Sequence, residues 1–290
     1  MKTTILITGA TGNTGLPLVK QLTAAGVPVR AMIHTPEKRS MVEGKTVEVA
    51  VGDFKNRASL EQAMKGIESA YLVSPPSLEQ VRDQTVFVDT AKAMGVKHIV
   101  KLSALGTAPD SPVGLLRWYA EIEDHIRRSG LKYTFLHPHF FMENLLANAG
   151  FVKKDGSIYS PLGDASISPV SVEDIAAVAV KALIEGVHSG KTFTLTGPEA
   201  VTYTDIAWIL AGVIGKPVRY VPVSFDAALK GMVQAGYPDW LAADLVRLMQ
   251  TWSEGRGSMV SVYVERLTGH KPLSVREFFD RHKSLFLAAA

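Results

Sequence analysis

The fold is decided by the segment Thr4-Ile5-Leu6-Ile7-Thr8-Gly9-Ala10-Thr11-Gly12-Asn13-Thr14-Gly15. A short apolar strand runs into three glycines at G-x-x-G-x-x-G spacing, and a helical pattern follows from Leu16. The first glycine permits a tight turn, the second lets a pyrophosphate approach the backbone, and the third lets helix and strand pack closely. Free N–H groups at the start of the helix then meet the phosphates. The segment therefore predicts a dinucleotide-binding turn in a βαβ unit.

Apolar runs of strand length alternate with helical patterns through the first 140 residues. Strands are expected at 4–7, 27–33, 46–51, 69–74, 98–103 and 133–136, and helices at 16–25, 58–65, 78–94 and 113–129. This alternation predicts an α/β Rossmann fold, a doubly wound parallel sheet with helices on both faces. Strands buried on both faces read as continuous apolar runs, as these do.

The pattern becomes less regular after Pro138. Helices are expected at 140–149, 172–185, 203–214, 225–235, 240–252 and 274–283, strands at 191–195 and 218–221, and turns at 156–164. We therefore expect a smaller C-terminal α+β cap. Residues 1–138 should form the Rossmann domain, with 165–187 returning to it, and residues 139–164 and 188–290 the substrate-side domain.

Composition excludes several function classes. The chain has 290 residues, of which 47% are hydrophobic and 20% charged, with a net charge of +3 and no cysteine. The lack of cysteine excludes disulfides, a thiolate nucleophile and Cys-ligated zinc. No apolar run approaches the roughly 18 residues that would span a bilayer, and no basic cluster is dense enough for nucleic acid. We expect a cytoplasmic protein with no nucleic-acid or membrane partner, and no metal, because His137 and His139 lack a third ligand.

The end of the second strand indicates which dinucleotide binds. An NAD site usually places an acidic residue there to hold the ribose 2′-hydroxyl, but this chain has His34, followed by Lys38 and Arg39. Such cations attract a 2′-phosphate, so we expect NADPH rather than NADH; the alternative is a solvated basic helix start.

After the third strand, Asp53 could accept the adenine amine and Phe54 could cover the ring. The alternative is an N-cap beside a core aromatic.

Several segments together resemble the NmrA-like atypical short-chain dehydrogenases. They are residues 8–15, Gly52-Asp53, Tyr71-Leu72-Val73-Ser74-Pro75-Pro76, Gly95-Val96-Lys97-His98-Ile99-Val100, Arg117-Trp118-Tyr119-Ala120-Glu121-Ile122-Glu123 and Phe140-Phe141-Met142-Glu143-Asn144. The resemblance implies NAD(P) binding by a Rossmann domain with a small C-terminal domain. It leaves the activity open, because some members reduce quinones, azo dyes, triphenylmethane dyes, imines or carbonyls, and others are redox-sensing regulators. Where the family often has Arg-Pro, this chain has His137-Pro138.

The Tyr-x-x-x-Lys pair of standard short-chain dehydrogenases is absent from this chain. Glu123 stands four residues after Tyr119, where a carboxylate is expected to raise the pKa of the tyrosine. Tyr119 is nevertheless the best proton donor, with a helix-surface phenol as the alternative. Ser103 is expected to face the substrate or to cap the next segment. His139, expected to titrate near neutrality, is either a catalytic donor or a structural hydrogen-bonding residue.

The remaining site residues are assigned as two groups. Cofactor contacts are expected from Gly9, Thr11, Gly12, Asn13, Thr14, Gly15, His34, Lys38, Arg39, Asp53, Phe54, Ser74, Pro75, Pro138 and Phe140. An aromatic pocket for a flat substrate is expected from Trp118, Phe141, Met142, Tyr159 and Trp252, at least half of which would otherwise be core residues.

Two functions follow from these expectations. The first is an NADPH-dependent reductase that transfers hydride to a quinone, azo compound, imine or carbonyl without a Tyr-x-x-x-Lys pair. The second is a non-catalytic NADP(H)-sensing regulator that binds a partner protein. A homodimer is common for this fold, but no segment of the sequence establishes one.

Overall fold

The computed structural model describes residues 4–185 and 189–287. The chain divides into two compact units, unit 1 (Met1–Pro138 and Val172–Thr194) and unit 2 (His139–Ser171 and Leu195–Ala290). Residues 165–171, expected to return to the first domain, lie in unit 2. The strand at 191–195, expected in the second domain, instead pairs with the last Rossmann strand and so covers an edge that would otherwise be open. The boundary expected between residues 187 and 188 lies outside the described residues.

Unit 1 contains a seven-stranded sheet of order β3-β2-β1-β4-β5-β6-β8. Its strands are β1 (Ile5–Ile7), β2 (Val29–Ile33), β3 (Val47–Val51), β4 (Ser69–Leu72), β5 (His98–Leu102), β6 (Lys132–Pro138) and β8 (Lys191–Leu195). Strands β1 to β6 pair in parallel. The strand order reverses between β1 and β4, and in such sheets dinucleotides bind outside the carboxyl ends of the strands at this switch point.

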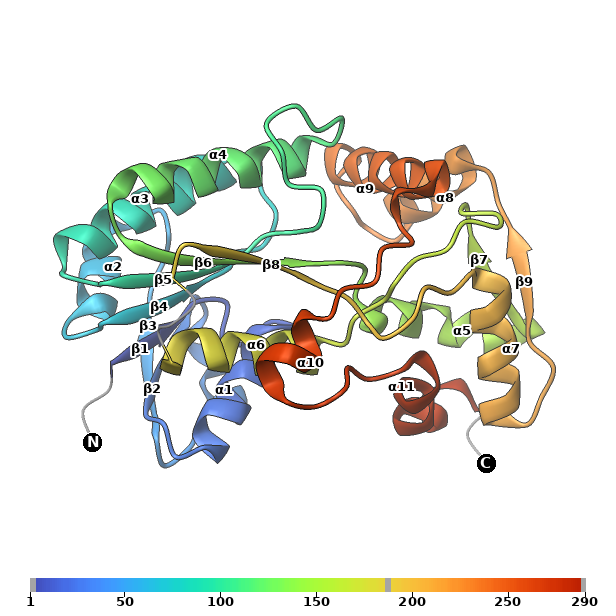
Figure 1. Ribbon diagram of the computed structural model, residues 1–290, viewed down its shortest axis with the longest axis horizontal. Coiled ribbons are helices and arrows are strands. Elements are labelled where there is room, and N and C mark those ends of the chain that lie inside the picture. The colour runs from blue at the N-terminus through green and yellow to red at the C-terminus, as the bar shows by residue number, and fades with distance from the viewer. Residues whose placement is uncertain (1–3, 186–188, 288–290) are drawn as a thin grey trace. The chain divides into compact units, whose positions relative to one another are not determined.

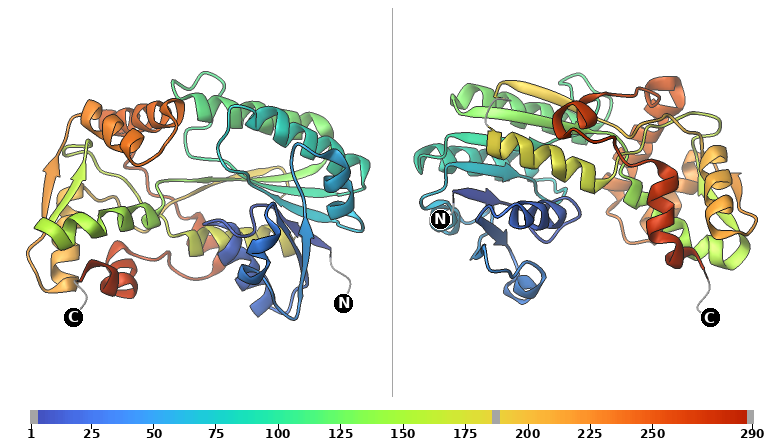
Figure 2. Two further views of the ribbon diagram at one scale, coloured as in Figure 1. Left: turned by 180° about the vertical axis from the view of Figure 1, so that it is seen from behind. Right: turned by 60° about the horizontal axis from the view of Figure 1, so that its bottom comes forward.

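Helices cover both faces of this sheet (Figures 1 and 2). One face carries α1 (Gly15–Ala24) and α6 (Val172–Glu185), and the other carries α2 (Arg57–Met64), α3 (Gln80–Ala93) and α4 (Gly114–Ser129). A 3₁₀ helix, η1 (Pro36–Met41), follows β2. Apolar residues of β4 and β5 pack under α3 and α4 in one buried cluster. The predicted Rossmann fold is confirmed.

Unit 2 combines a two-stranded parallel sheet with helices. The sheet pairs β7 (Ser157–Ser160) with β9 (Arg219–Pro222). The helices are η2 (Met142–Asn148), α5 (Ala149–Asp155), α7 (Tyr203–Ile214), α8 (Phe225–Gln234), α9 (Asp239–Thr251), η3 (Trp252–Arg256), α10 (Tyr263–Thr268), α11 (Val275–His282) and η4 (Lys283–Phe286). Two sequence expectations were wrong here, because the turn-rich segment 156–164 contains β7 and the helix expected at 140–149 is a 3₁₀ helix followed by α5.

Helices α7 and α11 of unit 2 begin with reciprocal caps that fix where each helix starts. The Thr202 hydroxyl accepts from the Asp205 N–H while the Asp205 carboxylate accepts from the Thr202 N–H, and Ser274 and Glu277 repeat the arrangement. Across the described ranges, no helix is long and apolar enough to cross a membrane. Nor does any group of three or more His, Asp or Glu side chains in these ranges lie close enough together to hold a metal ion.

Candidate functional site

The glycine turn between β1 and α1 is built so that backbone, rather than side chains, fills it. Gly9 has a φ of +56°, a left-handed conformation that glycine adopts without strain. A Cβ on Gly15 would overlap the carbonyl oxygen of Gly9, so the third glycine is needed for the helix to pack. Thr8 fixes the turn to the end of β4, because its hydroxyl lies 2.8 Å from the Val73 carbonyl oxygen and 2.9 Å from the Val73 nitrogen.

The second glycine has a different environment. Gly12 is exposed, and a Cβ there would meet only the Gly9 oxygen, at 3.2 Å. Asn13 beside it is exposed as well, whereas Thr14 is buried and makes no side-chain cap; its hydroxyl instead lies 3.2 Å from the Tyr71 hydroxyl. The start of α1 thus presents bare backbone, a surface that fits the pyrophosphate of a dinucleotide.

The carboxyl ends of β2 and β3 lie together beyond this turn. His34, Lys38 and Arg39 are all exposed, and the His34 Nε2 lies 3.7 Å from an Asp53 carboxylate oxygen. The other Asp53 oxygen accepts the Lys55 N–H at 2.9 Å, which closes the turn after β3. Phe54 packs its ring against Phe87 of the core at a centroid distance of 5.5 Å. These contacts match the structural alternative for Asp53 and Phe54. Lys38 and Arg39 are exposed beside His34, which itself contacts Asp53.

Two further predicted contacts end strands β4 and β6. Ser74, which follows β4, accepts a hydrogen bond of 2.8 Å from the Gln84 amide of α3, and Pro75 beside it is exposed. Pro138 ends β6, where its carbonyl oxygen accepts the Leu105 N–H at 2.9 Å. Both positions therefore lie at the carboxyl edge of the sheet.

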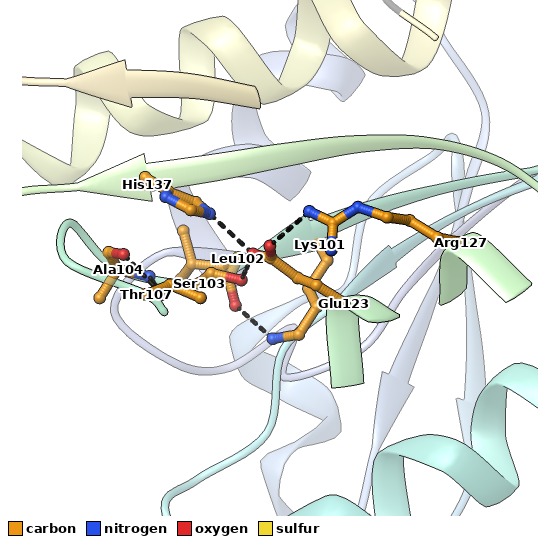
Figure 3. Close-up of polar contacts among 8 residues, drawn as sticks. All are labelled: Lys101, Leu102, Ser103, Ala104, Thr107, Glu123, Arg127 and His137. Atoms are coloured by element: carbon orange, nitrogen blue, oxygen red, sulfur yellow. Dashed lines mark hydrogen bonds and ion pairs between the residues drawn. The ribbon is translucent and has the colours of Figure 1, made fainter. Parts of the chain in front are cut away.

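A buried carboxylate joins β5, α4 and β6 (Figure 3). Glu123 of α4 accepts the Ser103 hydroxyl at 2.5 Å and lies 2.7 Å from the His137 Nε2 and 3.1 Å from Arg127. We call these four residues the Glu123 cluster. Burial alone would raise the pKa of Glu123, but His137, Ser103 and Lys101 together lower it. The Ser103 hydroxyl is therefore fixed by a carboxylate that stays ionised.

A lysine and a tyrosine meet beside this cluster. Lys101 of β5 is fully buried, its Nζ donates to the Leu102 carbonyl at 3.0 Å, and the same Nζ lies 4.6 Å from the centre of the Tyr119 ring. Burial lowers the pKa of Lys101 to about 7, with Glu123 opposing the change. Burial also raises the pKa of Tyr119, with the neighbouring Gln80 side chain opposing it.

The Lys101–Tyr119 pair was not predicted from the sequence. The standard motif has a lysine four residues after the tyrosine, whereas this lysine comes from a strand eighteen positions earlier in the chain. A raised pKa of Tyr119 was expected from Glu123, but its cause is burial, and Glu123 is paired with Ser103, His137 and Arg127. One signal was available: Lys101 interrupts an apolar strand that the pattern predicts to be buried on both faces.

The residues predicted in unit 2 mostly form its core. Phe140, Met142 and Trp252 belong to one buried cluster, and the Trp252 ring meets the Phe140 ring edge-on at 5.9 Å. Tyr159 is half-buried and packs against Phe151, while Phe141 is half-buried at the start of η2. Trp118 lies apart from this group in sequence and belongs to unit 1, on α4.

His139 does not have the character expected of it. It stacks on Trp252 at 5.0 Å, and its Nδ1 accepts the Phe140 N–H at 2.6 Å. Burial lowers the pKa of His139 to about 4, with the Gly257 backbone opposing the change. The expectation that His139 titrates near neutrality was wrong, because its ring is enclosed rather than solvated.

Known proteins resemble this chain along nearly its whole length. The NAD(P)H azoreductase of Xenophilus azovorans is 34% identical over 98% of this chain and 100% of its own. The NADPH-dependent quinone oxidoreductase of Escherichia coli, solved with NADPH, has a TM-score of 0.87 at 30% identity and covers 96% of this chain and 99% of its own. The triphenylmethane reductase of Citrobacter sp., solved with NADP(H), has a TM-score of 0.86 at 28% identity with the same coverage.

The family assignment rests on the full chain rather than on the glycine turn. The model of the NmrA-like family matches residues 1–278, which include both the Rossmann strands and most of unit 2. The resemblance inferred from the sequence segments is thereby confirmed. This chain belongs to the NmrA-like family.

Proposed function

We propose that this chain is an oxidoreductase that binds NADPH and reduces a flat, electron-poor small molecule such as a quinone or an azo compound. The observation that carries the proposal is the glycine turn before α1, where an exposed Gly12 and a fully packed Gly15 leave bare backbone at a helix start. When bound there, NADPH supplies a hydride. The protein's own residues bind the cofactor, orient the acceptor and supply a proton.

Each end of the cofactor has residues suited to it. His34, Lys38 and Arg39 are exposed cations, or potential cations, at the carboxyl edge of the half-sheet β1–β3. In a doubly wound sheet the second half, here β4–β6, receives the second mononucleotide, and the carboxyl edge of that half carries Ser103 and Tyr119. A full-length azoreductase relative at 34% identity supports acceptors of this class.

The test is NADPH oxidation by the purified protein with a panel of quinones, azo dyes, cyclic imines and aldehydes. Gly12→Val is the blank: Gly12 is exposed and a Cβ there would meet only the Gly9 oxygen, at 3.2 Å, so the variant should fold after a small local shift, but its side chain would occupy the surface offered to the pyrophosphate. Turnover by the wild type well above this blank supports the proposal. NADPH binding without turnover of any acceptor would contradict it and favour the non-catalytic regulator.

A further inference from the structure

We infer that Lys101 is a positioning residue for proton delivery by Tyr119, so that a tyrosine–lysine pair is assembled from β5 and α4 rather than from one turn of a helix. The inference rests on the reductase function proposed above and adds the source of the proton. Its geometric basis is the Lys101 Nζ, which lies 4.6 Å from the centre of the Tyr119 ring.

Both side chains lie where an acceptor is reduced in such folds. Lys101 is the last residue but one of β5, and Tyr119 is in the second turn of α4, which begins at the same edge of the sheet. Gln80, against the Tyr119 phenol, opens α3 at that edge too. Three successive elements therefore bring their polar side chains to the carboxyl edge of the β4–β6 half, where ligands bind.

The groups around Lys101 leave Tyr119 as the ionisable group that its ammonium can influence. Glu123 is the carboxylate that acts on Lys101, and it already pairs with Arg127 and with His137. Tyr119 faces the amine from α4, while the nearby Gln80 of α3 is neutral. A charge a few ångströms from a phenol favours the ionised phenol, so the Lys101 ammonium makes Tyr119 a better acid.

The proton step has a clear balance. Addition of a hydride to a quinone leaves a hydroquinone monoanion, which takes a proton as the Tyr119 O–H bond breaks and a new O–H bond forms on the product. The tyrosinate that remains is stabilised by the Lys101 ammonium and regains its proton from solvent. A triphenylmethane dye differs, because its carbocation becomes a neutral leuco compound on accepting a hydride and needs no proton.

The experiment compares these two acceptors, because quinone reduction needs a proton and dye reduction does not. Single-turnover rates are measured with saturating NADPH for one quinone and one triphenylmethane dye, in the wild type, Tyr119→Phe and Lys101→Met. Matched controls are Tyr133→Phe, near the opposite end of β6, and Lys92→Met, an exposed position on α3. NADPH affinity is measured separately by fluorescence, and the unfolding of the cofactor-free proteins is followed against pH.

The expected result is a loss confined to the quinone. Tyr119→Phe should slow quinone reduction about 100-fold and Lys101→Met about 10-fold, with dye reduction, NADPH affinity and both controls changed less than about 3-fold. Wild-type quinone reduction should decline as pH rises through about 7, where the ammonium is lost, and Lys101→Met should lack that decline. Equal losses on quinone and dye, or none on either, would overturn the inference while leaving the reductase function standing. The reductase function itself is refuted only by a wild type that turns over neither these two substrates nor any acceptor of the panel described above.

Discussion

Replacing Lys101 by methionine should stabilise the cofactor-free protein, most strongly at low pH. Lys101 is fully buried, and burial lowers its pKa from 10.5 to about 7. Methionine has a similar unbranched shape, so it removes the amine without opening a large cavity. The lost hydrogen bond to the Leu102 carbonyl opposes the gain by about 1 kcal/mol, independently of pH.

The size of the effect follows from proton linkage. The folded pKa lies about 3.5 below the unfolded value (10.5 minus 7), and at about 1.4 kcal/mol for each tenfold change this corresponds to about 5 kcal/mol. The unfolded chain binds more protons than the folded one between these two values, so wild-type stability rises with pH there. The cost of the buried ammonium is fully present below pH 7 and fades as pH increases toward 10.5.

The assay is urea unfolding of the wild type and Lys101→Met at about pH 6 and about pH 9. The difference in the free energy of unfolding should shrink by about 3 kcal/mol between these two conditions. Glu123, whose pKa Lys101 helps to lower, is ionised at both pH values and so adds nothing to this change. Lys92→Met, at an exposed site, should show no such dependence. A Lys101→Met difference that stays constant with pH would mean that the amine does not titrate near neutrality, and our electrostatic argument would be wrong.

Three other substitutions test the stability of the fold and the cofactor preference separately. Gly15→Ala should lower the free energy of unfolding by about 1–3 kcal/mol in urea melts, because the new Cβ overlaps the Gly9 carbonyl; unchanged stability would refute the packing argument. His34→Asp should shift cofactor preference toward NADH in comparative binding titrations, since a carboxylate repels a 2′-phosphate, and an unaltered preference would remove His34 from that site. Ser274→Ala should cost about 1 kcal/mol by thermal or urea unfolding through loss of the α11 cap, whereas Ser258→Ala, at an exposed position outside any helix, should cost almost nothing.

Local signals were sufficient to predict most of unit 1. Strand-length apolar runs, helical spacing and the glycine turn each reside in a few consecutive residues, so the sequence predicts the parallel sheet directly. Strand β7 was missed because Ser157–Ser160 becomes a strand only by pairing with Arg219–Pro222, some sixty residues later. The last sheet strand was assigned to the wrong domain for the same reason, since only its pairing places it.

The candidate site also has a part that local sequence predicts and a part that depends on contacts between distant segments. The turn glycines are recognised by spacing, but burial sets the pKa of His139, Tyr119 and Lys101, and burial depends on packing between distant segments. A motif confined to one helix does not include a lysine contributed by a neighbouring strand. The useful sequence signal was the cost of placing Lys101 in a strand that is buried on both faces, rather than any spacing.

Two of the buried charged residues of unit 1, Glu123 and Lys101, indicate different roles. Glu123 has Ser103, His137 and Arg127 as partners, so its ionised form is well compensated and it serves to hold β5, α4 and β6 together. Lys101 has a backbone carbonyl, the face of a tyrosine ring and the attraction of Glu123, which together do not offset the burial of its ammonium. A lysine that lowers the stability of the fold, in a strand where valine or leucine would suffice for packing, is better explained by chemistry than by structure. Reduction rates with the quinone, which needs a proton, and with the triphenylmethane dye, which does not, distinguish these explanations. Loss of a purely structural lysine would slow both reductions equally.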